Sequence, residues 1–255
     1  MTDEPQPQQG AEPVLTGSAF LYEQPELLTP EQHGALGLTP PERPYDFVRN
    51  VRAIPVTLPE FATAQRHYPI VFASMEDPVP LAVTAILDDT NLFVDEQGRW
   101  DPMCYVPSYL RCYPFGLATD DQGRGALLID RKSAAVTAEP RYPFFEGGEL
   151  SEHTKQMVQF CSQYEAERAR TRELCERLRD LELLTPQQAT YTPTGASEQQ
   201  TLASYVCIDA KKLTDLDKDT IYGWHRSGEL SCLYSHLHSL DNWRTLMARR
   251  QQKAL

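Results

Sequence analysis

The chain has 255 residues, enough for one large domain or two small ones, and its 41% hydrophobic and 24% charged residues are compatible with a globular core. A formal net charge of -12 disfavours nucleic-acid binding, because an acidic chain repels phosphate backbones. The one basic segment, residues 248–253, is short and close to the C-terminus, and we interpret it as an exposed helix end.

Nothing in the sequence predicts a membrane span or a signal peptide. No apolar run approaches the ~20 residues of a helical span, and the N-terminal MTDEPQPQQGAEP lacks a basic segment followed by an apolar one. We therefore expect a cytoplasmic protein whose six cysteines stay reduced. They form no CxxC pair, so we expect small core or half-buried residues rather than zinc ligands or a redox centre.

The organisation of the chain is expected to be a leader followed by one domain. Residues 1–28 are rich in Pro and Gln and poor in large apolar residues, which predicts a disordered leader. Residues 29–255 are expected to form a single domain, or alternatively two sub-units, 29–147 and 148–255, that meet where the pattern changes from strands to helices.

The first half of the domain reads as short strands separated by turns. Residues 91–100 (NLFVDEQGRW) place a polar turn between β-prone residues, and Gly98 supplies the positive φ that such a loop needs. Residues 115–130 repeat this arrangement around Asp-Asp-Gln-Gly. The runs PIVFAS and PLAVTAIL are rich enough in β-branched and aromatic residues to be strands.

The spacing of apolar residues changes after Ser151. No Pro or Gly occurs from there to about Leu183, and the apolar residues recur at helical intervals, with Ser151 as the N-cap. The middle of this segment is charged on nearly every side, so we expect it to bridge over solvent or to lie along an edge of the domain. A coiled-coil dimer seam is the alternative, with weaker support from two separated apolar clusters.

A hairpin and short helices are expected to complete the fold. Residues 189–194 and 200–209 read as paired strands. Helices follow, with Asp217 as an N-cap, Gly228 as a stop and a further Asp cap at Asp241. In the segment ELSCLYSHLHSL we expect one apolar face, formed by Leu230, Leu233, Tyr234 and Leu237. The fold class is therefore α+β: antiparallel or mixed strands with two short helices, one long central helix, then the hairpin and short helices.

The motif Arg-x-Tyr-Pro occurs at Arg66–Pro69 and again at Arg111–Pro114, and a shortened version follows at Arg141–Pro143. A residue before proline is pushed out of the helical conformation, so each Tyr must end the short helix before it. We interpret the first two copies as joints between a helix and a strand. The alternative is that the two Tyr rings and the two Arg side chains line a shared groove.

Three segments resemble the SapC family, which is named for a gene in a surface-layer locus of a bacterium. They are TLPEFATAQRHYPIVF, NLFVDEQGRWDPMCYVPSYLRCYPFGLATD and GELSCLYSHLHSLDNW, and the resemblance runs from about His33 to Met247. It implies a bacterial α+β protein. Members are often described as surface-layer-related or found near surface receptors, cupin-like oxygenases and flavin halogenases, which implies a role around peptide or surface-protein modification. The resemblance assigns no catalytic residues.

Aromatic and charged residues are densest between residues 95 and 113. Arg and aromatic side chains are typical anchors of protein and peptide interfaces. The alternative is that the rings belong to the core and the charges to turns. The predicted binding residues are Asp95, Arg99, Trp100, Tyr105, Tyr109, Arg111, Tyr113 and, from the C-terminal segment, His236.

We expect no metal and no other cofactor. Cys232 and His236 share a helix face and His225 lies nearby, but no carboxylate completes a ligand set, and His-x-Asp or His-x-Glu does not occur. The acidic turns at Asp88, Asp89 and Asp95, and at Asp120 and Asp121, are read as solvated rather than as ion sites. No nucleophile-elbow or phosphate-loop motif is found.

The function that the sequence favours is a non-enzymatic binding or accessory protein that engages a protein or peptide partner. The alternative is an enzyme acting on peptides, or a helper subunit of an oxygenase or flavin halogenase, which rests only on what the resemblance implies. A DNA-binding regulator that uses the C-terminal helices is disfavoured by the acidic charge.

Overall fold

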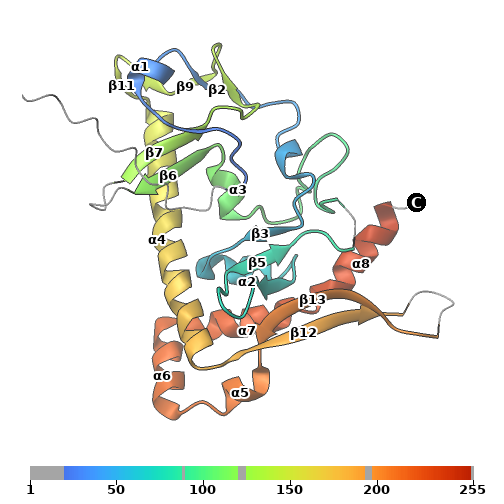
Figure 1. The fold of residues 1–255 in the computed structure, drawn as a ribbon. Helices are drawn as coiled ribbons and strands as arrows, with labels where there is room; N and C mark the ends of the chain where they lie inside the picture. The colour runs from blue at the N-terminus through green and yellow to red at the C-terminus, as the bar shows by residue number, and fades with distance from the viewer. Residues whose placement is uncertain (1–19, 88–89, 120–124, 193–196, 254–255) are drawn as a thin grey trace, which may run out of the picture. The chain divides into compact units, whose positions relative to one another are not determined.

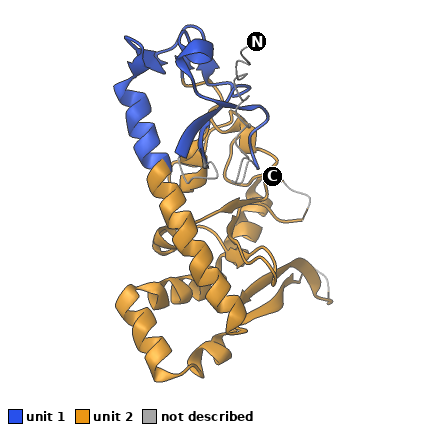
Figure 2. Ribbon diagram, turned by 60° about the vertical axis from the view of Figure 1, so that its left-hand side comes forward, with its two compact units in different colours: residues 1–39, 114–161 blue, residues 40–113, 162–255 orange. Residues whose placement is uncertain are grey.

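A computed structural model describes residues 20–87, 90–119, 125–192 and 197–253 and confirms the α+β class (Figure 1). The chain divides into two compact units that interleave along the sequence: residues 1–39 with 114–161, and residues 40–113 with 162–255 (Figure 2). A single boundary at residue 147 does not describe this division, because each unit combines segments from both halves of the chain.

The first unit contains a three-stranded antiparallel sheet of order β1-β7-β6, formed by β1 (Pro25–Leu27), β7 (Gly125–Asp130) and β6 (Phe115–Thr119). β6 and β7 are the second predicted hairpin. β1 lies within the segment predicted as a leader, whose residues 1–19 are outside the described part of the chain. The fully buried carboxylate of Asp130 explains why the chain is held here, since it accepts the backbone N–H groups of Glu23 and Gln24 at 3.1 and 2.9 Å.

Short elements complete the first unit: α1 (Pro30–His33), β2 (Gly37–Leu38), β8 (Val136–Thr137), β9 (Tyr142–Pro143), β10 (Phe145–Glu146) and β11 (Glu149–Leu150). β2 pairs with both β8 and β9, and β10 pairs with β11. The core of this unit contains Phe115 and Phe144, both fully buried, with ring centroids 5.6 Å apart.

The second unit is built on a five-stranded antiparallel sheet of order β12-β13-β4-β5-β3. Its strands are β3 (Ala53–Pro55), β4 (Ile70–Phe72), β5 (Pro80–Val83), β12 (Leu184–Tyr191) and β13 (Gln200–Ile208). β12 and β13 form the predicted C-terminal hairpin, although β12 begins five residues before the predicted strand at 189. β4 and β5 lie within the two predicted strand runs. Along the described chain, β13 pairs with β4 at one position only, Val206 with Phe72.

Both copies of the Tyr-Pro motif join a helix to a strand, as predicted. A 3-10 turn, η2 (Leu58–Glu60), and α2 (Phe61–Ala64) precede Tyr68-Pro69, which leads into β4. α3 (Ser108–Cys112) precedes Tyr113-Pro114, which leads into β6. Tyr113 has extended backbone angles, φ -58° and ψ 136°, as expected for a residue before proline.

The predicted long helix is α4 (Glu152–Asp180), which contributes residues 152–161 to the first unit and the remainder to the second. Ser151 caps it, because its Oγ accepts the N–H of Thr154 at 3.2 Å. The helix ends three residues earlier than predicted, before Glu182, which has a positive φ of 53°. Among the described residues, no helix combines the length and apolarity needed to cross a membrane.

The remaining helical elements are η1 (Asp46–Val48), α5 (Ala210–Thr214), α6 (Lys218–Ser227), α7 (Glu229–Ser239) and α8 (Asn242–Lys253). Asp217 caps α6, and Gly228 ends it with a φ of 81°, both as predicted. The prediction that Tyr234 belongs to the buried face of α7 is wrong, because Tyr234 is 47% exposed. The buried residues of α7 are Leu233, Ser235, His236 and Ser239.

Candidate functional site

The eight predicted binding residues do not form one surface. Asp95, Arg99 and Trp100 line a pocket beside the first predicted hairpin, and Tyr105 and Arg111 belong to a separate hydrogen-bond network. The other three, Tyr109, Tyr113 and His236, occupy three further environments. The set therefore separates into a pocket, a polar network, an aromatic stack and two core positions.

The turn from Asp95 to Arg99 forms the rim of the pocket. Val94 pairs with Trp100, the N–H of Asp95 donates to the carbonyl of Arg99 at 2.9 Å, and Gly98 has a φ of 70°. The Asp95 carboxylate accepts the N–H and the Nε–H of Arg99, both at 2.9 Å. These bonds, led by the backbone one, hold the pKa of Asp95 below its usual value, so it stays charged at neutral pH.

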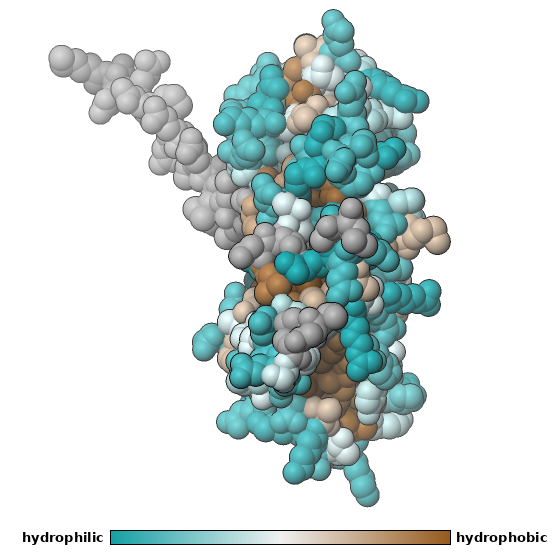
Figure 3. All heavy atoms as spheres, turned by 90° about the vertical axis from the view of Figure 1, so that its right-hand side faces the viewer, coloured by the Kyte–Doolittle hydropathy of each residue, from teal (hydrophilic) through white to brown (hydrophobic). Residues whose placement is uncertain are grey.

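We call the concavity beside this turn the hairpin pocket, a cavity of about 550 Å³. Its lining residues are Leu92, Phe93, Val94, Asp95, Arg99, Trp100, Asp101, Pro102, Arg249 and Lys253. Rings and aliphatic side chains form the floor, while charged side chains of both signs surround it. Other apolar residues also reach the surface in hollows between polar side chains (Figure 3).

The far wall of the hairpin pocket comes from α8. Arg249 donates to Asp101 at 2.9 Å, and its guanidinium lies 4.4 Å from the centroid of the Phe93 ring. The ammonium of Lys253 donates to the carbonyl oxygens of Asn91 and Val94 at 2.9 and 3.0 Å. The C-terminal helix is thereby tied to the hairpin, and its cations are held at fixed positions beside the apolar floor.

Two titratable groups beside Arg249, Asp101 and Cys104, have shifted pKa values. Burial acts to raise the pKa of Asp101, but the N–H of Met103 and the Arg249 guanidinium outweigh it and hold the pKa below its usual value. Burial raises the pKa of the neighbouring Cys104 thiol to about 11. At neutral pH Asp101 is therefore a carboxylate, and the neighbouring Cys104 is a protonated thiol, which is a poor nucleophile.

Glu60 is the centre of a polar network, and it was not among the predicted residues. Its buried carboxylate accepts the N–H and hydroxyl of Thr57, both at 2.8 Å, the N–H of Ser108 at 2.7 Å and the hydroxyl of Tyr105 at 3.0 Å. Arg111 donates to the Tyr105 and Ser108 hydroxyls at 3.0 and 2.7 Å. This network joins the start of η2 to the loop before α3, so Tyr105 and Arg111 hold the fold together here.

The two Tyr residues of the repeated motif have different environments. Tyr68 is fully buried, with its ring centroid 4.6 Å from that of Phe93, and its hydroxyl donates to the carbonyl of Tyr105. Tyr113 is half-buried and stacks on Phe47 with 4.1 Å between centroids and 16° between planes. The two rings therefore do not line a shared groove, and only Tyr113 retains partial exposure.

Three predicted binding residues are buried. Trp100 and Tyr109 are 6% and 5% exposed, and His236 is fully buried in α7. Tyr109 packs near Tyr164 and His236 near Phe72, with ring centroids 6.1 and 5.0 Å apart. Tyr109 and His236 therefore lie in the core, and Trp100, although buried to a similar degree as Tyr109, also lines the hairpin pocket.

Sequence reasoning missed the partners from distant segments. Arg249 and Lys253 lie some 150 residues beyond the hairpin they contact, in the segment interpreted as an exposed helix end. Glu60 had a local signal that was not used: Thr57 and Glu60 have the spacing of a capping box, and both of its hydrogen bonds are present.

Within the described part of the chain, no three His, Cys, Asp or Glu side chains converge to hold a metal ion. The acidic pairs at 88–89 and 120–121 lie outside the described residues. All six cysteines are free thiols: Cys112, Cys161, Cys175 and Cys207 are buried, and Cys104 and Cys232 are half-buried. This distribution confirms that the cysteines are core or half-buried residues.

The SapC family model matches residues 28–246, nearly the whole chain. The chain belongs to the SapC family. No curated protein and no solved structure matches it. Family membership confirms the predicted resemblance, and the function of this SapC protein has to be argued from its own residues.

Proposed function

We propose that this SapC protein binds a protein or peptide partner at the hairpin pocket, and that it acts as a non-enzymatic accessory component of a bacterial surface-protein or peptide-modification system. The observation that supports the proposal is the combination of an apolar lining, in which Pro102 is exposed and Trp100 nearly buried, with fixed charges around it. Pockets of about 300–1,000 Å³ with an apolar lining and a few placed polar groups are typical ligand sites.

The arrangement favours a partner segment with an apolar residue beside an acidic one. The apolar side chain would lie against Pro102, the exposed apolar residue of the lining, beside the nearly buried Trp100. Its acidic neighbour would meet the guanidinium of Arg99, which is 64% exposed and projects from the rim. Arg99 is already paired with Asp95, so a partner carboxylate would share an exposed and adaptable ion pair rather than meet an unpaired charge.

The titration states in the pocket favour binding over catalysis. Asp95 and Asp101 both have lowered pKa values, so neither is suited to donate a proton near neutral pH. Cys104, beside the pocket, is protonated near neutral pH because burial raises its pKa to about 11. The alternative, an enzyme acting on peptides or a helper subunit of an oxygenase or flavin halogenase, would require its reactive groups elsewhere.

A phage-displayed library of random dodecapeptides, selected on the immobilised protein, tests the proposal. We expect enriched peptides to pair an apolar with an acidic residue and to bind Arg99→Ala at least tenfold more weakly. Arg170→Ala is the matched control, because Arg170 is 61% exposed and forms a similar ion pair, three residues from Glu167 in α4. Equal binding to wild-type protein and Arg99→Ala, or equal loss in the Arg170→Ala control, would contradict the proposal.

A further inference from the structure

The central sheet of the second unit divides between β4 and β13. Val206 and Phe72 are the single pair that joins these strands in the described chain. One ladder step further, Ile70 and Ile208 would be the next pair. Their N–H groups instead donate to α7, Ile70 to Ser239 Oγ at 2.9 Å and Ile208 to His236 Nε2 at 3.1 Å. α7 therefore replaces the ladder on this side of the Val206–Phe72 pair.

On the other side of that pair, β13 continues without β4. Alternate residues of a strand direct their backbone groups to the same side. The backbone groups of Val206 point towards β4, and the N–H of Ile208 points towards α7 on the same side. The backbone N–H and C=O of Ser204 must therefore point to this side as well. β4 has ended at Phe72, and the N–H of Ala73 turns back to the carbonyl of Val79 at 2.9 Å. The exposed Ser204 thus presents its N–H and C=O where the described residues provide no strand partner.

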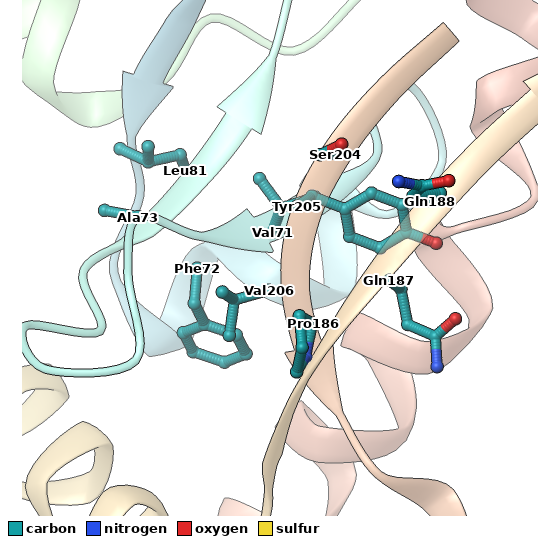
Figure 4. Close-up of a pocket in the computed structure, with 10 residues that line it drawn as sticks. All are labelled: Val71, Phe72, Ala73, Leu81, Pro186, Gln187, Gln188, Ser204, Tyr205 and Val206. Atoms are coloured by element: carbon teal, nitrogen blue, oxygen red, sulfur yellow. The ribbon is translucent and has the colours of Figure 1, made fainter. Parts of the chain in front are cut away.

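A groove of about 820 Å³ lies at this point, and we call it the split-sheet groove (Figure 4). It is lined by Val71, Phe72, Ala73, Leu81, Pro186, Gln187, Gln188, Ser204, Tyr205 and Val206. None of these side chains is charged. Aliphatic and aromatic groups provide apolar contacts, while two amides and two hydroxyls provide neutral hydrogen-bonding groups.

We propose that an extended peptide segment of a partner protein adds to β13 as a strand in the split-sheet groove. A strand edge whose N–H and C=O point into a groove recognises the backbone of an extended peptide, and the adjacent pockets select its alternate side chains. The uncharged lining specifies a neutral segment. Exposed Glu76 and Asp77, in the turn that follows Ala73, favour a basic residue where the segment leaves the groove.

The outer edge of β12 is the competing place for an added strand, because β12 is the end strand of the sheet. It is poorly suited to the role. Pro186 lacks an N–H, which discourages pairing at this edge. The register shift places an extra residue, Leu202, in β13, because Ala189 pairs with Ala203 and Thr190 with Thr201. Ser204 lies in the regular part of β13 beyond this bulge and keeps its N–H, so the groove is the favoured place for the partner strand.

Two proline variants distinguish binding in the groove from binding at the outer edge of β12. Gln188 pairs with Ser204, and Ser204 directs its backbone groups away from β12, so the Gln188 N–H points to the outer edge. Ser204→Pro removes a donor from the groove, and Gln188→Pro removes one from the outer edge. Neither removes a bond between β12 and β13. Ser204→Ala keeps the groove N–H and controls for the loss of the hydroxyl.

The probe is a pool of acetylated octapeptides with a lysine at each end and alternating Thr and randomised apolar residues between them. We expect peptides enriched on the wild-type protein to bind Ser204→Pro at least tenfold more weakly, and to bind Ser204→Ala and Gln188→Pro within threefold of wild type. Failure to enrich any peptide, unchanged binding to Ser204→Pro, or loss in Gln188→Pro instead would overturn the proposal.

N-methylated peptides supply a second measurement that needs no protein variant. A peptide strand in the groove forms hydrogen bonds with β13 through only one of the peptide's two backbone edges. N-methylation of the alternate peptide residues whose N–H groups lie on that edge should therefore abolish binding to the wild-type protein. N-methylation of the residues on the other edge should leave the affinity within threefold. Equal effects of the two patterns would indicate apolar adsorption without strand pairing, and would overturn the proposal even if Ser204→Pro failed to fold. The hairpin pocket is not involved, so this result is independent of the proposed function.

Discussion

His236 Nε2 accepts the backbone N–H of Ile208 at 3.1 Å, although the imidazole is fully buried in α7. An acceptor at Nε2 requires the neutral ring with its proton on Nδ1. Burial lowers the pKa of His236 to about 4, partly opposed by the backbone of Ile70. His236, one of the predicted binding residues, is thus a neutral side chain that supports the end of β13.

The first prediction is a loss of stability at mildly acidic pH. The pKa of His236 is higher in the unfolded chain, about 6.5, than in the folded protein. As the pH falls, the unfolded chain therefore binds a proton at this residue first. This contribution to stability is therefore complete above pH 6.5 and is lost as the pH falls towards 4. Between pH 7 and pH 5 the loss from this one group is about 2 kcal/mol.

Urea denaturation of wild-type protein and His236→Gln at several pH values checks this prediction. The Gln side chain offers an oxygen to the Ile208 N–H but does not titrate, so the variant should lose the part of the pH dependence that His236 provides. His225→Gln, in an exposed turn of α6, is the control and should retain the wild-type dependence. An unchanged pH profile in His236→Gln would contradict the assignment.

The second prediction contrasts the two Tyr residues of the repeated motif. Tyr68→Ala should lower the free energy of unfolding by about 3–5 kcal/mol, because it removes a fully buried ring beside Phe93. Tyr113→Ala should lower it by only about 1–2 kcal/mol, because its ring is half-buried and the stack on Phe47 is partly in water. Chemical denaturation of both variants measures the difference, and equal losses would show that the two positions are equivalent.

The third prediction concerns the Glu60 network. Glu60→Gln places an amide N–H₂ where the carboxylate accepts four hydrogen bonds, so at least one buried donor loses its acceptor. We expect a loss of about 2–3 kcal/mol. Glu173→Gln, at an exposed position of α4, is the control and should change the free energy of unfolding by less than about 0.5 kcal/mol. Indistinguishable melting of the two variants would mean that the network contributes no net stability.

The fourth prediction compares two glycines with positive φ, Gly98 at 70° and Gly228 at 81°. Gly228→Ala should cost about 1 kcal/mol from backbone strain alone, since the added methyl group meets open space. Gly98→Ala should cost more, because its methyl group would lie 2.7 Å from Cβ and 3.1 Å from Cα of Arg43. Calorimetric melting of the two variants checks the order, and a greater loss in Gly228→Ala would contradict it.

The sequence by itself determined the elements whose cause is local. Proline fixed both helix-to-strand joints, because its ring excludes a helical conformation at the residue before it. Asp217, Gly228 and Ser151 defined helix ends through caps that act within three or four residues.

Only the tertiary structure decided which residues share a site. Arg249 reaches the hairpin, Glu60 collects donors from residues almost fifty positions away, and Ser239 and His236 take the N–H groups that would have joined β4 to β13. Local patterns do not encode such contacts, because they depend on how distant segments pack. For the same reason Tyr68 became core and Tyr113 did not, although the two stand in nearly identical sequences.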